Sequence, residues 1–100
     1  MILSVSTGRT SINPGRVLDF GTFGLFGQWC LRNFQMEGHI DEYKFYVQKK
    51  RGFKHHPSFT RFPRQRRLVV RMERHLGAVS QTQIVVYQKP DNLPCFCAIQ

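Results

Sequence analysis

The sequence predicts an α+β domain in which a small antiparallel sheet of about three strands packs against one or two helices. Three observations predict it. Apolar residues fall at helical spacing over residues 25–36, and they alternate with polar residues over residues 40–48. The first 23 residues are rich in Gly, Ser, Thr and Pro, which is typical of an extended arm. A chain of 100 residues suffices for one domain. We therefore expect an N-terminal arm over residues 1–23 and a single domain over 24–100.

The arm has two interpretations. Its first 18 residues contain Arg9 and Arg16, three serines, two threonines and no acid, which is the composition of an organellar transit peptide. However, Gly8 and the strong turn signal Asn13-Pro14-Gly15 interrupt the amphipathic helix that such a peptide needs. The alternative is an ordinary N-terminal arm that lies along a partner. Both interpretations are compatible with the sequence.

The predicted helix over residues 25–36 has its apolar face in Phe26, Trp29, Cys30 and Phe34. Gly38 stands just beyond it as a stop signal. Core packing explains these aromatic residues. Their spacing therefore predicts a helix and no ligand site.

Residues 40–48 are predicted to form a half-buried strand. One face carries Tyr43, Phe45 and Val47, and the other carries Lys44, Tyr46 and Gln48. A cationic turn follows at residues 49–52. Two prolines and two histidines in residues 53–63 indicate an irregular loop.

Residues 64–76 fit either a helix or a strand. Leu68, Val69, Met72 and Leu76 keep helical spacing, although the apolar run at 68–70 also suits a strand. Pro63 before the segment and Gly77 after it favour the helix. We further expect strands over residues 81–88 and 95–99, joined by a turn at 89–94.

Positive charge is concentrated in residues 44–74, called here the basic segment. The chain has 15 Lys and Arg against 6 Asp and Glu, a formal net charge of +9. The basic segment holds 11 of those cations and one acid, Glu73, so its net charge is +10 and the rest of the chain sums to −1. Solubility of a small domain requires a net charge of only about 2–8. We therefore expect a polyanionic partner.

Aromatic residues interleaved with these cations favour RNA. Cations contact phosphates while aromatic rings stack on unpaired bases. Taken singly, Phe53, Phe59 and Phe62 fit internal packing better, and Tyr46 fits either role. The residues expected to bind RNA are Lys44, Tyr46, Lys49, Lys50, Arg51, Phe53, Lys54, His55, His56, Arg61, Arg64, Arg66, Arg67, Arg71 and Arg74.

Catalytic and metal sites have weaker signals. Cys95-Phe96-Cys97 lacks the second ligand pair typical of structural zinc sites, so we expect no metal and no other cofactor. The six acids are scattered, and His39 with Asp41 and Glu42 is the only local cluster that could supply general acid and base groups. A solvated corner between the helix and the strand explains that cluster better. We therefore expect neither enzymatic activity nor a small-molecule substrate.

The leading functional hypothesis is a non-catalytic RNA-binding subunit of a ribonucleoprotein, such as an organellar ribosomal protein that contacts ribosomal RNA and neighbouring proteins. The alternatives are a viral or mobile-element coat protein that binds nucleic acid, and a basic accessory subunit of a mitochondrial membrane complex. The uncharged stretch at residues 20–31 is too short to cross a bilayer. Three cysteines without a disulfide framework favour a reducing intracellular compartment, either the mitochondrial matrix or the cytoplasm.

Overall fold

The computed structural model describes residues 2–8, 10–16, 20–75 and 79–89. These residues form β1 (Ile2–Ser6), β2 (Ser11–Arg16), α1 (Phe23–Asn33), the short 3-10 turn η1 (Ile40–Glu42), β3 (Tyr43–Lys49), β4 (Gly52–His56), β5 (Arg67–His75) and β6 (Val79–Lys89). The described strands make one antiparallel sheet of six strands in the order β2-β1-β6-β5-β3-β4. The prediction of a helix with an antiparallel sheet is confirmed. The expected number of about three strands is wrong.

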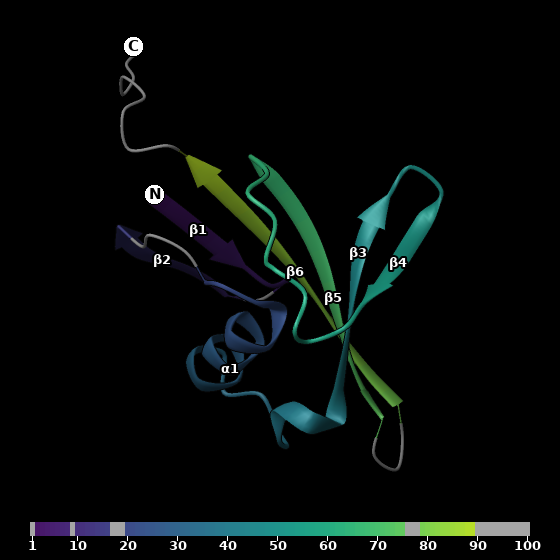
Figure 1. Ribbon diagram of the computed structural model, residues 1–100. Helices are drawn as coiled ribbons and strands as arrows, with labels where there is room; N and C mark the ends of the chain where they lie inside the picture. Colours follow the sequence, from purple (N-terminus) through teal and green to yellow (C-terminus); the bar gives the residue numbers. More distant parts are fainter. Residues whose placement is uncertain (1, 9, 17–19, 76–78, 90–100) are drawn as a thin grey trace.

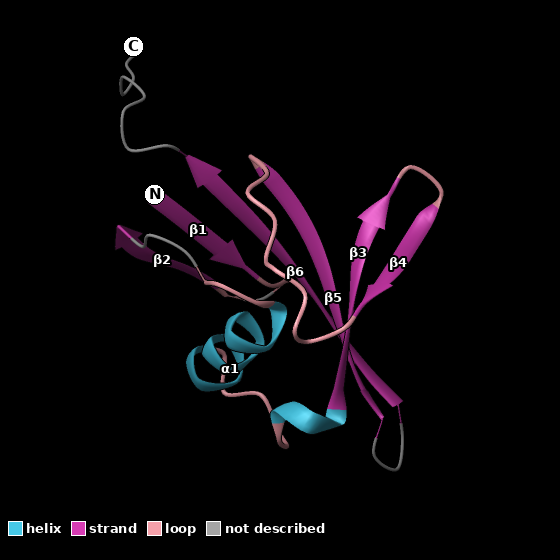
Figure 2. Ribbon diagram, in the orientation of Figure 1, coloured by secondary structure: helices cyan, strands magenta, loops and turns pink. Residues whose placement is uncertain are grey.

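Helix α1 packs on one face of this sheet (Figure 2). Helix α1 buries Phe23, Phe26 and Cys30. These side chains pack against alternate residues of the strands. The strand residues of this core are Val5, Phe45, Val47, Leu68, Val70, Met72, Ile84 and Val86. Cross-strand pairing places Val47 opposite Val70 and Val70 opposite Ile84, so the core continues across three strands.

Gly27 determines how closely α1 approaches the sheet. A Cβ atom at this position would lie 2.6 Å from Cζ of Phe45, well inside van der Waals contact. Thr22 caps the helix by accepting a hydrogen bond from the Leu25 amide. The helix ends at Asn33, five residues before the predicted stop at Gly38.

The helical interpretation of residues 64–76 is wrong, because residues 67–75 form strand β5. Leu68, Val70 and Met72 point to the helix-covered core, as the period of two requires. Val69 is also buried, on the opposite face of the sheet. Because apolar residues lie on both faces of the strand, their spacing in the sequence resembles that of a helix. Strand β5 pairs with β6 along the whole length of β5, from Arg67↔Tyr87 to His75↔Val79.

Residues 2–8 and 10–16, which belong to the expected extended arm, instead contain two paired strands, and β1 joins them to the sheet through its pairing with β6. The hairpin turns at Thr7 and Thr10, where the Thr7 amide donates to the Thr10 carbonyl at 2.8 Å. Asn13-Pro14-Gly15, expected as a turn, lies within edge strand β2. The register shifts by one residue there, and a bulge in an edge strand is a position where proline is tolerated.

The cationic turn and the loop after it are partly as predicted. Lys50 and Arg51 form a tight turn between β3 and β4, and Gly52 has φ +105°, a backbone conformation that favours glycine. The first residues of the expected loop belong to β4, which ends at His56. The remaining residues, 57–66, pass the N-terminal end of α1 before the chain enters β5 (Figure 1). The predicted strand 95–99 and the turn 89–94 lie outside the described residues apart from Lys89, which ends β6.

Candidate nucleic-acid interface

The face of the sheet opposite α1, called here the uncovered face, is covered by no described helix or loop (Figure 2). Alternation along the strands and the pairing register assign its side chains. On strands β3 to β6 they are Lys44, Tyr46 and Gln48 from β3, Phe53 and His55 from β4, Arg67, Val69, Arg71, Glu73 and His75 from β5, and Gln81, Gln83, Val85 and Tyr87 from β6. Aromatic, cationic and amide side chains therefore share one surface.

A guanidinium stacked on two rings lies at the centre of the uncovered face. The Arg71 guanidinium carbon is 4.2 Å from the ring centroid of Phe53 and 5.3 Å from that of Tyr46. The Tyr46 ring in turn contacts the His55 ring, with centroids 5.4 Å apart. These four residues come from three adjacent strands. Stacking between a guanidinium and aromatic faces is attractive, and here it holds both rings in place.

Glu73 ties this cluster to the rest of the face. Its side chain is buried, with Oε2 at 2.9 Å from Arg71 Nε and Oε1 at 3.3 Å from His75 Nε2. Gln81 Nε2 also donates to Oε2 at 3.3 Å. The contact with Arg71 is an ion pair whose geometry falls outside that of a hydrogen bond. Arg71, predicted from the sequence to contact RNA, is therefore engaged within the protein and positions Tyr46 and Phe53.

Tyr87 and Arg67 form a second, more exposed pair on the uncovered face. They lie opposite each other on β6 and β5, and Arg67 Nε donates to the Tyr87 hydroxyl at 3.3 Å. Tyr87 is 45% exposed, although β6 lies inside the sheet between β1 and β5. Sequence reasoning missed Tyr87 because it lies outside the basic segment. Its place in the alternation of residues 81–88 is the signal that could have found it.

The exposed cations gather at one end of the sheet. Because β3 and β5 are antiparallel, the β3–β4 turn with Lys49, Lys50 and Arg51 lies at the end where β5 begins. Residues 64–66 lie at this end too, because Gln88 Nε2 donates to the carbonyls of Pro63 and Gln65, both at 3.0 Å. Figure 1 shows the β3–β4 hairpin and the start of β5 as two branches that diverge at this end. Arg64, Arg66 and Arg67 therefore lie across from the lysine-rich turn.

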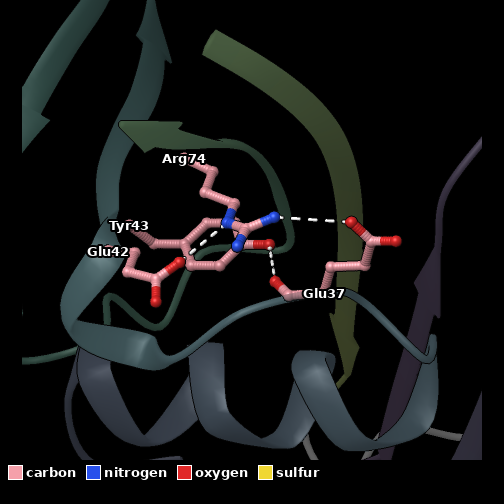
Figure 3. A network of polar contacts seen from close by, with 4 residues as sticks. All are labelled: Glu37, Glu42, Tyr43 and Arg74. Atoms are coloured by element: carbon pink, nitrogen blue, oxygen red, sulfur yellow. Dashed lines mark hydrogen bonds and ion pairs between the residues drawn. The ribbon is translucent and has the colours of Figure 1, made fainter. Parts of the chain in front are cut away.

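Arg74, also predicted to bind RNA, lies on the helix-covered side in a separate polar network (Figure 3). Its Nε donates to Glu42 Oε1 at 2.7 Å, and its Nη1 lies 3.4 Å from Glu37 Oε2. The Tyr43 hydroxyl donates to the Glu37 backbone carbonyl. The hydrogen bond from Arg74 lowers the pKa of Glu42 and raises that of Arg74. Two carboxylates thus neutralise this cation at the acidic end of the molecule.

Gly38 allows that network to close. Its φ is +90°, and a Cβ atom there would lie 2.6 Å from Arg74 Nε. The glycine predicted as a helix stop therefore has a different role, which is to let the backbone approach the guanidinium.

His56 and Lys54, two further residues of the predicted set, lie on the helix-covered side of β4. The His56 ring stacks on Phe23 at a centroid distance of 5.2 Å and an interplanar angle of 22°. Burial lowers the pKa of His56, and the neighbouring charges of Lys49 and Lys54 lower it further. His56 is thus half-buried at the edge of the sheet, whereas Lys54 is exposed.

The remaining aromatic residues of the basic segment divide between core and surface. Phe62 is buried against Phe26, with ring centroids 4.6 Å apart. Phe59 is 80% exposed in the loop before β5. Arg61, between them, is exposed and forms an isolated β-bridge with Thr22. The loop therefore brings Arg61 to the start of α1, away from the uncovered face.

The described residues contain no group of three or more His, Cys, Asp and Glu side chains that could hold a metal ion. Cys95 and Cys97 lie outside them. Cys30 is buried in the core, and burial raises the pKa of its thiol. Of the helices described, none is long and apolar enough to cross a membrane. Comparisons with protein-family models, curated proteins and solved structures returned no match.

Proposed function

We propose that this protein binds single-stranded RNA on the uncovered face and serves as a structural subunit of a ribonucleoprotein. The observation that carries the proposal is the placement of Tyr46, Phe53 and Tyr87 on one uncovered sheet face that ends in a cluster of exposed cations. Rings on such a face offer stacking platforms to unpaired bases.

The polar neighbours of these rings suit base edges. Gln83 pairs with Arg71 across β6 and β5, and Tyr46 pairs with Arg71 on one side and with His55 on the other. This row crosses four strands, and its outer members Gln83 and His55 are exposed. Amide and imidazole groups both donate and accept hydrogen bonds, as the edges of unpaired bases require. Bases in a duplex would present neither their faces nor their Watson–Crick edges.

The cationic end of the sheet suits the RNA backbone. Lys49, Lys50 and Arg51 on one branch and Arg66 with Arg67 on the other provide charges that could neutralise phosphates beside the stacked bases. Binding to single strands weakens by about 0.7 log units per log unit of salt for each phosphate neutralised. A strong salt dependence is therefore part of the proposal.

Two matched charge removals test it. Arg67→Ser removes an exposed cation from the uncovered face, and Arg32→Ser removes an exposed cation from helix α1 on the other side of the sheet. With a labelled single-stranded RNA, Arg67→Ser is expected to weaken binding several-fold and to reduce the salt slope by about 0.7, while Arg32→Ser leaves both unchanged. Equal effects of the two variants would exclude the uncovered face as the site.

The proposed setting has its own test. Copurification at one copy per RNA-containing particle supports a structural subunit of a ribonucleoprotein. RNA-dependent self-association into large assemblies supports a coat protein instead.

A further inference from the structure

We infer that Phe59 forms a second contact with RNA, in which one unpaired base stacks on its ring. This inference rests on the proposed function and adds a contact away from the uncovered face. Phe59 is 80% exposed, the most exposed large apolar side chain among the described residues. Single exposed apolar side chains are common, but Phe59 stands out because hydrogen bonds fix the turn that carries it.

The turn that carries Phe59 is tied to the start of α1. The Thr60 amide donates to the Pro57 carbonyl at 3.0 Å and closes the turn. Two amides of the first helical turn then donate to it, from Phe23 to the Thr60 carbonyl at 3.0 Å and from Gly24 to the Ser58 carbonyl at 2.8 Å. These carbonyls satisfy amides that a helix start otherwise leaves without a partner.

Glycine makes this docking possible. A Cβ atom at Gly24 would lie 3.3 Å from the Ser58 carbonyl oxygen, which is closer than ordinary van der Waals contact. After the turn, the Phe62 amide donates to the Gly21 carbonyl at 2.7 Å, and Phe62 enters the core. The turn is therefore fixed on both sides of Phe59, and its backbone loses little further freedom when a ligand binds.

Size and charge favour a base as the occupant. A phenylalanine ring buries about 150–250 Å², whereas a stable protein interface needs about 1,200 Å² or more. The contact area of one phenylalanine ring therefore suits a single base and is far too small for a protein interface. Two exposed cations stand near the turn in the sequence, Lys54 before it and Arg61 after it, and they supply positive charge for the phosphates of a bound strand.

The experiment measures binding of a labelled single-stranded RNA of about 12 nucleotides to the full chain. Phe59→Ala is expected to weaken binding about 5-fold or more, as loss of one base–aromatic stack does. The control is Leu25→Ala, which removes an exposed apolar side chain from the neighbouring helix and is expected to leave binding unchanged. Phe59→Trp is expected to retain binding, and RNA should quench its fluorescence more strongly than that of the unmodified protein, which contains only Trp29.

The outcomes separate this inference from the proposed function. The Phe59 contact is wrong if the protein binds RNA, Phe59→Ala binds it equally well, and RNA does not quench the tryptophan introduced by Phe59→Trp. The proposed function then stands. If the unmodified protein does not bind RNA, both the Phe59 contact and the proposed function are wrong. Quenching by anionic lipid vesicles in place of RNA would also overturn the inference, because it would assign the ring to a membrane surface.

Discussion

The Arg71 guanidinium lies 4.2 Å from the centroid of the Phe53 ring, although the two residues belong to strands β5 and β4, which are not adjacent. The Arg71 side chain therefore extends over β3, where it also contacts Tyr46. Its charge is balanced by the buried carboxylate of Glu73. This contact organises the uncovered face, and it removes from the candidate phosphate contacts one arginine that the sequence had placed among them.

Replacing Arg71 should lower the stability of the fold. Arg71→Ala is expected to reduce the free energy of unfolding by about 3 kcal/mol, because it leaves the Glu73 carboxylate buried beside weaker partners. Arg71→Lys should be intermediate, since it keeps the charge but loses planar stacking. Urea denaturation at pH 7 measures both. Arg66→Ala, at an exposed position, is the control, and a loss no larger for Arg71→Ala than for Arg66→Ala would contradict this role.

Gly27 is required for the contact between α1 and the sheet. Alanine is the better helix former by about 1 kcal/mol, yet Gly27→Ala is expected to destabilise the protein by about 1 kcal/mol or more. The reason is that the added Cβ atom would lie 2.6 Å from the Phe45 ring. Gln28→Ala, at the exposed next position, should change the melting temperature little. Stabilisation by Gly27→Ala would show that the helix does not pack this closely.

His56 should contribute to a loss of stability in mild acid. Its pKa in the folded state is lowered from 6.5, chiefly by burial, so the unfolded chain binds the proton more readily. Stability is therefore complete above about pH 6.5 and falls as the pH decreases toward the lowered pKa. Denaturation at pH 7.5 and pH 5.5 should show a smaller loss for His56→Phe than for the unmodified protein. His55→Phe is the control, and an unchanged loss in His56→Phe would refute the assignment.

Glu42 should have the corresponding effect at lower pH. The hydrogen bond from Arg74 lowers its pKa from 4.5, so its contribution to stability is present above about pH 4.5 and disappears as the pH falls through the lowered pKa. The difference in stability between the unmodified protein and Glu42→Gln should therefore be large at pH 7 and shrink below pH 4.5. Asp41→Asn, which alters a neighbouring exposed carboxylate, should show no such pattern. A difference that stays constant with pH would contradict the role of Arg74.

Elements with one buried face could be predicted from the sequence. The alternation of Tyr43, Phe45 and Val47 correctly predicted strand β3 and the side of it that faces the core. The helical spacing of Phe26 and Cys30 predicted α1. Strand β5 could not be told from a helix in the sequence, because it is buried on both faces and its apolar residues do not alternate. Local pattern cannot resolve such a segment, since its pairing with β6 and β3 is a tertiary property.

The candidate site could be predicted only as a segment. Charge density located residues 44–74, but it could not separate Arg67, exposed beside Tyr87, from Arg74, which is held by two carboxylates behind the sheet. That difference depends on which face of the strand each arginine occupies, and on two carboxylates more than 30 positions away in the chain. Phe59 and Phe62 illustrate the same limit, because only the docking of their loop on α1 decides which ring is exposed.

The most direct test of the central proposal is a titration of the isotope-labelled protein with a single-stranded RNA oligonucleotide, followed by amide chemical shifts. The account predicts salt-sensitive shifts at Tyr46, Phe53 and Tyr87 on the uncovered face. Gln28 and Arg32 on the outer side of α1 should keep their positions. Shifts concentrated on α1 with none on the uncovered face, or no shifts at low salt, would contradict it.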